Sequence, residues 1–201
     1  MLKELFDLVK NNATETVINN PAVPNELNDE VVAEATDTVA SGLRNMVAGG
    51  GLQSIISMFT GGGNKQPSNS SLLSNPLVSM MIGHFVGKLT NKFNMSGGDA
   101  NQVANNLIPQ VLSSLVNKSN DNNDSTFSLE GLLNSITGGQ LDQQQQNNGI
   151  NLQDIIGQLS GGQQNGGGMS DILAQLAQGA QQQQQRNGGG GLMDLIKGFM
   201  K

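Results

Sequence analysis

The chain contains no cysteine, no tryptophan and no tyrosine, and it has six phenylalanines in 201 residues. Without cysteine it has no disulfides, no thiolate ligands for a metal and no cysteine nucleophile, and it is compatible with a reducing compartment. Because aromatic rings are so few, a buried core has to be built from Leu, Ile, Val, Met and Ala, which suit helix packing. We therefore expect a small helical core.

Charge is also scarce, and the balance is acidic. Only 13% of the residues are charged, the formal net charge is -6, and the two arginines, Arg44 and Arg186, are far apart. Binding to a phosphate backbone needs clustered Lys and Arg, so nucleic acid is not a favoured partner. No run of 18 apolar residues predicts a membrane span, and the charged N-terminus does not look like a signal peptide. We expect a cytoplasmic protein.

Small and amide residues are abundant, above all after residue 118. Asn and Gln number 45 and Gly 27, with glutamine tracts at 143–146 and 181–185 and a glycine run at 188–191. Such segments bury too little apolar area to offset the entropy lost on ordering. Residues 119–201 are therefore predicted to be a flexible low-complexity tail.

Residues 1–63 are predicted to be an N-terminal helical region. Apolar residues at Leu2, Leu5, Phe6 and Val9 repeat with the helical period. A second helix is expected from an Asn28 cap to the glycines at 49–51. Its apolar side would carry Val31, Val32, Ala35, Val39, Leu43, Met46 and Val47, and its opposite side Glu34, Asp37, Ser41 and Asn45.

After a linker at 64–71, residues 72–118 are predicted to form a three-helix core. Asn75 and Pro76 have the pattern of a helix cap followed by a first-turn proline. A second cap is expected at residues 96–102, made either by Ser96 with Asp99 or by Asp99 with Gln102. Pro109 interrupts the next apolar run, so we expect two helices there, at about 99–107 and 109–117. The fold class is all-α, with a small helical core, N-terminal helices and the tail.

A short motif recurs along the chain, with apolar residues at its positions 1, 4, 5 and 8 and glycine or the chain end after it. Copies begin at Leu52, Leu129 and Leu152, and looser copies at Met169 and Leu192. The four positions form one helical stripe, and helices this short need a surface to pack on. The predicted interaction stripe comprises Leu129, Leu132, Leu133, Ile136, Leu152, Ile155, Ile156, Leu159, Leu192, Leu195, Ile196 and Phe199.

The segments NPLVSMMIGHFVGKLTNKF (75–93) and DANQVANNLIPQVLSSLVNK (99–118) resemble the uncharacterised bacterial YidB-like DUF937 family. The repeated LxxIIxxLxGG pieces and the N-terminal segments MLKELFDLVKNNA and NNPAVPNELNDEVV resemble its longer Bacteroidetes-type members. The resemblance implies a helical, homeodomain-like unit with no established activity. It supplies no catalytic residues.

The residues themselves offer no catalytic, cofactor-binding or metal-binding set. His84 is the single histidine and has no second histidine or cysteine to complete a site. Asp121 and Asp124 lack the full spacing of a calcium-binding loop. No glycine run precedes Lys-Ser/Thr as a phosphate-binding loop requires. We therefore expect a protein that is not an enzyme and has no cofactor.

Three functions stay open from the sequence. The leading hypothesis is a structural or interaction protein that acts through its apolar stripes, by self-association or by docking on a protein partner. One alternative is a weak DNA-binding homeodomain-like module that reads with the helix at 109–117, although that helix has no basic residue before Lys118. The other is peripheral membrane contact through the amphipathic segment 192–201.

Overall fold

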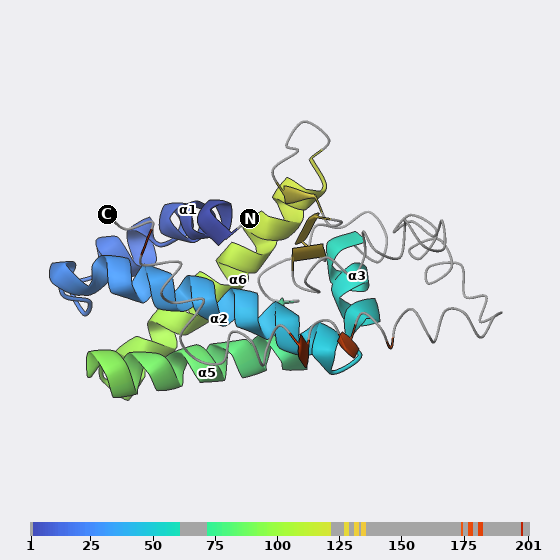
Figure 1. The fold of residues 1–201 in the computed structure, drawn as a ribbon. Coiled ribbons are helices and arrows are strands. Elements are labelled where there is room, and N and C mark those ends of the chain that lie inside the picture. The colour runs from blue at the N-terminus through green and yellow to red at the C-terminus, as the bar shows by residue number, and fades with distance from the viewer. Residues whose placement is uncertain are drawn as a thin grey trace.

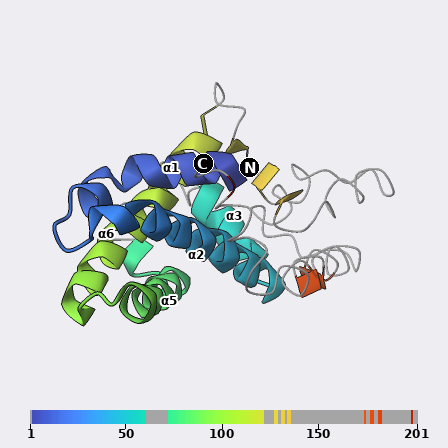
Figure 2. The ribbon, with the colours of Figure 1, turned by 60° about the vertical axis from the view of Figure 1, so that its left-hand side comes forward.

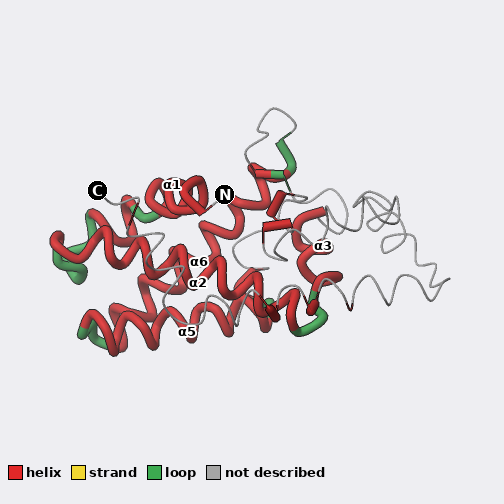
Figure 3. Tube along the Cα trace, in the orientation of Figure 1, coloured by secondary structure: helices red, strands yellow, loops and turns green. Residues whose placement is uncertain are grey.

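The computed structural model describes residues 2–60 and 72–121, and further short pieces or single residues at 127–128, 131–132, 134–135, 174, 177–178, 181–182 and 198. Of the described residues 85% are helical and none is in a strand, which confirms the predicted all-α fold (Figure 3). The helices are α1 (Leu2–Asn12), α2 (Asn28–Ala48), α3 (Leu52–Thr60), α5 (Pro76–Phe93) and α6 (Gly97–Ser119), with a π-helical turn at Thr14–Ile18 and a 3-10 turn at Asn25–Leu27.

Helices α2 and α6 lie at the centre of the bundle. α2 contacts α1, α3, α5 and α6, and α6 packs most extensively on α5. In Figures 1 and 2, α1 lies on one side of α2 and α5 on the other, while α3 turns away from the C-terminal end of α2. The buried apolar side chains of 5–59 and 72–116 form one continuous cluster.

Most helix ends follow the sequence signals, but the expected Asn28 cap is wrong, because Asn28 is the first residue of α2, Leu27 holds the cap position and no side-chain cap hydrogen bond forms there. Asn75 Oδ1 accepts a hydrogen bond from Leu77 N at 2.9 Å, with Pro76 at the first helical position. Ser96 Oγ accepts from Asp99 N at 3.1 Å, so the first of the two expected caps is the one that forms. α2 ends at Ala48, and Gly50 adopts a φ of 80°, which favours glycine.

The predicted break at Pro109 is wrong. α6 is one helix from Gly97 to Ser119 with Pro109 inside it, so residues 72–118 contribute two long helices rather than three. An interior proline costs about 3 kcal/mol through its lost hydrogen bond and its clash with the preceding turn. Leu107, Ile108, Val111 and Leu112 on both sides of it are fully buried. We attribute the continuous helix to the burial of this uninterrupted face.

The polar side of α2, opposite its apolar residues, is more buried than an amphipathic surface helix implies. Glu34 is buried, Asp37 and Ser41 are partly buried, and Asn45 alone of the four is exposed. The apolar residues expected on the other side are all buried. α2 is therefore enclosed over most of its circumference, because it is the central helix and α5 covers the side that carries its charges.

Replacing Asn75 by alanine tests the cap at the start of α5. The change leaves Leu77 N without its side-chain acceptor, and loss of such a cap typically destabilises a protein by about 1 kcal/mol. Asn91→Ala, an exposed position in the same helix, is the control and should change stability by less than about 0.5 kcal/mol. Urea unfolding measures both, and equal midpoints for the two variants would contradict the assigned cap.

Candidate interaction surfaces

α3 is the copy of the recurring motif that the structure describes most fully. Its stripe residues Leu52, Ile55, Ile56 and Phe59 have exposed fractions of only 1–3%. Gln53, Ser54 and Ser57, between them, are exposed. The stripe faces the bundle, where α3 contacts α2 and α6. Asn120 Nδ2, just beyond α6, donates to Phe59 O at 2.7 Å. In this copy the motif is thus an amphipathic helix that packs its stripe on other helices.

The copy that begins at Leu129 is described in part, and its start is built like a helix N-terminus. Leu132, one of the predicted stripe residues, is buried and helical. Ser128 Oγ accepts from Gly131 N at 3.0 Å, and Ser128 O accepts from Leu132 N at 2.9 Å. Phe127 is buried as well. Phe127 and Leu132 flank the Ser128 cap with the spacing of a hydrophobic staple.

The sequence reasoning missed the role of Phe127, although the apolar residue just before a serine cap is the signal that would have indicated it. The other predicted stripe residues lie outside the described part of the chain. They are Leu129, Leu133, Ile136, Leu152, Ile155, Ile156, Leu159, Leu192, Leu195, Ile196 and Phe199.

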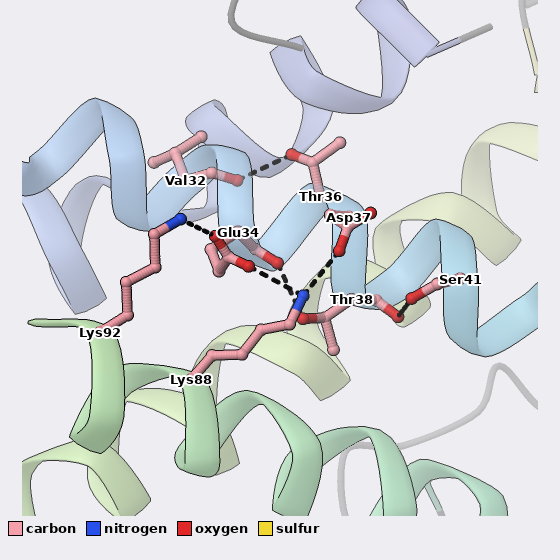
Figure 4. A network of polar contacts seen from close by, with 8 residues as sticks. All are labelled: Val32, Glu34, Thr36, Asp37, Thr38, Ser41, Lys88 and Lys92. Atoms are coloured by element: carbon pink, nitrogen blue, oxygen red, sulfur yellow. Dashed lines mark hydrogen bonds and ion pairs between the residues drawn. The ribbon is translucent and has the colours of Figure 1, made fainter. Parts of the chain in front are cut away.

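A cluster of ion pairs joins α2 to α5 (Figure 4). Lys88 Nζ lies 2.9 Å from Glu34 Oε1 and 2.6 Å from Asp37 Oδ2, and Lys92 Nζ lies 2.5 Å from Glu34 Oε2. The two lysines sit one turn apart on α5 and point up to the acids of α2. The Glu34 and Lys88 side chains are 7% and 20% exposed. We call these four residues the α2–α5 ion cluster.

The environment of the ion cluster shifts the pKa values of Glu34 and Lys88 in the direction that favours their charged forms. Burial raises the pKa of the Glu34 carboxyl, but hydrogen bonds from Lys92 and Lys88 outweigh it, and the net pKa is lowered from 4.5. Burial likewise lowers the pKa of the Lys88 ammonium, but its bonds to Asp37 and Glu34 outweigh that effect and raise it above 10.5. Both the Glu34 carboxyl and the Lys88 ammonium are therefore charged across the neutral range.

Two threonines beside the ion cluster donate their hydroxyl groups to backbone carbonyls of α2. Thr36 Oγ1 donates to Val32 O and Thr38 Oγ1 donates to Glu34 O, each at 2.8 Å, and both side chains are buried. These bonds to the carbonyl one turn earlier are intrahelical. The threonine bonds therefore stay within α2, and the ion pairs drawn in Figure 4 are what join α2 to α5.

A pocket of about 260 Å³ opens between α2 and α5, next to the ion cluster along both helices. We call it the α2–α5 groove. Its α5 side carries Met80, of which 71% is exposed. Gly42 forms part of its wall, and a Cβ atom there would lie 2.7 Å from Met81 Cγ. The lining residues are Thr38, Ser41, Gly42, Asn45, Met46, Leu77, Met80, Met81 and His84.

The structure does not bring together the residues considered as possible catalytic or metal-binding groups. His84 is exposed at the edge of the groove, and Asp121 is exposed beyond α6, while Asp124 lies outside the described residues. Within the described ranges, no three His, Cys, Asp or Glu residues are grouped as metal ligands would be. No described helix is long and apolar enough to cross a membrane.

The helix that the DNA-binding alternative would use is part of the bundle. In the 109–117 stretch of α6, Val111, Leu112, Leu115 and Val116 are buried. Ser114, a polar residue of this stretch, donates its hydroxyl to Asn12 Oδ1 of α1 at 2.9 Å. This side of α6 therefore packs on α1 instead of presenting a polar surface.

Comparison with known proteins gives no further guide to function. No family model, no curated protein and no solved structure matches the chain. The class of protein that the fold defines is an all-α bundle with a recurring amphipathic motif, and its function has to be argued from its own surfaces.

Proposed function

We propose that this chain is a non-catalytic structural or interaction protein that acts through its recurring short amphipathic helices, by association with further copies or by docking on a protein partner. The observation that supports this is the packing of α3, whose four stripe residues are all buried against neighbouring helices. The copies after residue 128 repeat the same stripe pattern. A cytoplasmic location and membership of the YidB-like DUF937 family belong to the same proposal and rest on the sequence.

The test compares two full-length variants that carry the same added charge. In the copy at 152–159, Ile155→Asp with Ile156→Asp places two carboxylates on the stripe, where burying an unpaired charge is costly. The matched control, Gln153→Asp with Gln158→Asp, places them off the stripe. Both variants and the unmodified chain are measured by size-exclusion chromatography with light scattering over a range of concentrations, and by pull-down with tagged protein.

We expect the unmodified chain and the control to associate, with themselves or with a recovered partner, and the stripe variant to bind at least about tenfold more weakly, which corresponds to 1.4 kcal/mol. A monodisperse monomer at every concentration for all three proteins, with no partner recovered, would overturn the proposed function.

A further inference from the structure

Three methionines and the single histidine of the chain meet at the α2–α5 groove. Met80, Met81 and His84 line it from α5, and Met46 lines it from α2. Thioether sulfur is a soft ligand that selects Cu(I), and imidazole nitrogen also suits copper. His84 has no second histidine or cysteine to pair with, but methionine supplies another type of donor. The groove therefore brings four donor side chains of the kinds that Cu(I) binds to one cavity.

The spacing along α5 puts the three donors of that helix on one face. Met80 and His84 are four residues apart, and Met81 and His84 are three apart. Residues at these spacings are neighbours on a helix, with Cβ atoms about 5–6 Å apart. The donor atoms of one ion lie roughly 3–4 Å apart, given metal–ligand bonds of about 2.0–2.3 Å. A methionine side chain has three rotatable bonds, which carry its sulfur across the remaining distance.

Gly42 brings the sulfur of Met81 to α2. A Cβ atom at Gly42 would lie 2.8 Å from Met81 Sδ, so that sulfur sits directly against the α2 backbone. Met46 is four residues after Gly42, one turn further along the same face of α2. The Met81 thioether therefore lies at the α2 side of the groove, within one helical turn of Met46.

The groove has a buried floor and an exposed mouth. Met46 and Met81 are 5% and 4% exposed, whereas Met80 is 71% exposed and His84 is exposed as well. A methionine as exposed as Met80 adds little to the core. Its flexible, polarisable side chain suits it to close over an ion that enters from solvent.

The lining favours a soft monovalent ion over a hard divalent one. Besides the four donors it consists of Thr38, Ser41, Gly42, Asn45 and Leu77. Mg²⁺ and Ca²⁺ bind through oxygen ligands, above all carboxylates, and this lining contains none. Taking an uncompensated charge out of water is costly, and the cost is smaller for one positive charge than for two.

We propose that the α2–α5 groove is a Cu(I) site whose ligands are the thioethers of Met46, Met80 and Met81 and the imidazole of His84. The imidazole binds in its neutral form, as metal ligation requires, and the thioethers are uncharged, so the complex has a single positive charge. This inference goes beyond the proposed function, because it assigns a ligand to the groove and no role to the recurring motif.

Substitutions that remove one donor and keep the fold test the site. Met80→Leu removes the sulfur from a side chain of similar volume, and His84→Gln removes the imidazole. Both positions are exposed, so the core stays intact. Met95→Leu, at a buried methionine outside the groove lining, is the matched control. The full-length proteins are titrated with Cu(I) under anaerobic conditions, in competition with a chromophoric Cu(I) chelator.

We expect the natural chain and Met95→Leu to bind one Cu(I) per chain. Met80→Leu and His84→Gln should bind at least about tenfold more weakly, a loss seen even when a residue behind a metal ligand is replaced. Circular dichroism without metal should be the same for all four proteins, which separates ligation from folding. Equal Cu(I) affinities for all four, or no binding by the natural chain, would overturn the proposal.

The methyl signals of methionine identify the ligands directly. Ag(I), a soft ion that does not change oxidation state here, is added to full-length protein labelled with ¹³C at its methionine methyl groups. We expect shifts at Met46, Met80 and Met81 and none at Met58 or Met95. Shifts confined to methionines outside the groove would place the ion elsewhere and overturn the proposal. None of these outcomes bears on the 155/156 variants, so this inference and the proposed function fail independently.

Discussion

Lys88→Met is expected to destabilise the protein by about 2–4 kcal/mol at neutral pH, since removing one partner of a buried ion pair leaves the other charge uncompensated. Lys88 bridges Glu34 and Asp37, and only 20% of its side chain is exposed. After the change, Glu34, which is 7% exposed, keeps an ion pair only with Lys92. The Lys92 side chain is 42% exposed and interacts with solvent as well as with Glu34. Asp37 loses the ion pair altogether. Urea unfolding monitored by circular dichroism measures the loss.

The same substitution at a surface ion pair is the control. Lys3 pairs with Asp7 at 2.8 Å across one turn of α1, and both side chains are more than half exposed. Exposed pairs contribute little to stability because water and salt screen them. Lys3→Met should therefore leave the unfolding midpoint where it is. A Lys88→Met midpoint that also stays unchanged would show that the α2–α5 ion cluster does not stabilise the fold.

The loss of folding stability caused by Lys88→Met should depend on pH in a defined direction. The pKa of Glu34 is lowered in the folded chain, so its ionised form contributes stability above 4.5 that is lost as pH falls below that value. The pKa of Lys88 is raised, so its contribution is present below 10.5 and is lost as pH rises beyond it. The difference between the two proteins should be largest between these limits and shrink on the acid side.

The ion cluster is also where the sequence was least informative. Period and capping predicted the all-α class, the α5 cap at Asn75 and the glycine end of α2, because these depend on residues close together in the chain. Glu34 and Lys88 are 54 residues apart, and helical periodicity placed Glu34 on the side of its helix opposite the apolar residues. Only the packing of α5 on α2 turns that side into the interior.

Pro109 shows the opposite failure, in which a local rule was applied too strictly. An isolated helix would break there, but the residues on both sides of Pro109 bury their whole apolar face against α1, α2 and α5. Tertiary packing of this extent outweighs the cost of about 3 kcal/mol for an interior proline. The neighbours that supply it come from residues 2–93, so no window around Pro109 contains the information.

The groove could not be predicted because it is a property of two helices at once. Leu77, Met81 and Met46 have the helical spacing of ordinary core positions, so no local pattern marks them as the lining of a groove. A Cβ at Gly42 would lie 2.7 Å from Met81 Cγ, so the glycine leaves room for the Met81 side chain at this point. The stripe motif, by contrast, is local, and its copy in α3 buries all four positions that the pattern picks out.

Phe59→Ala measures how strongly one such stripe holds a helix in place. Phe59 is the last stripe residue of α3 and is 1% exposed, so truncation removes the ring and leaves a cavity under α3. Changes of this kind cost about 3–5 kcal/mol. Ser57→Ala, exposed on the same helix, is the control and should stay within about 0.5 kcal/mol of the natural chain.

The two variants are compared by thermal and urea unfolding, and amide hydrogen exchange of α3 reports local opening. If Phe59→Ala costs less than about 1 kcal/mol, well below the range for a buried aromatic, α3 is only loosely held. A stripe that weak could not hold the same motif on a separate partner, where association costs a further 4–15 kcal/mol in lost translational and rotational freedom on standard estimates. A destabilisation of about 3–5 kcal/mol, with amide protection lost in α3 before α6, would show that the stripe packs strongly enough for the motif to act as a docking helix.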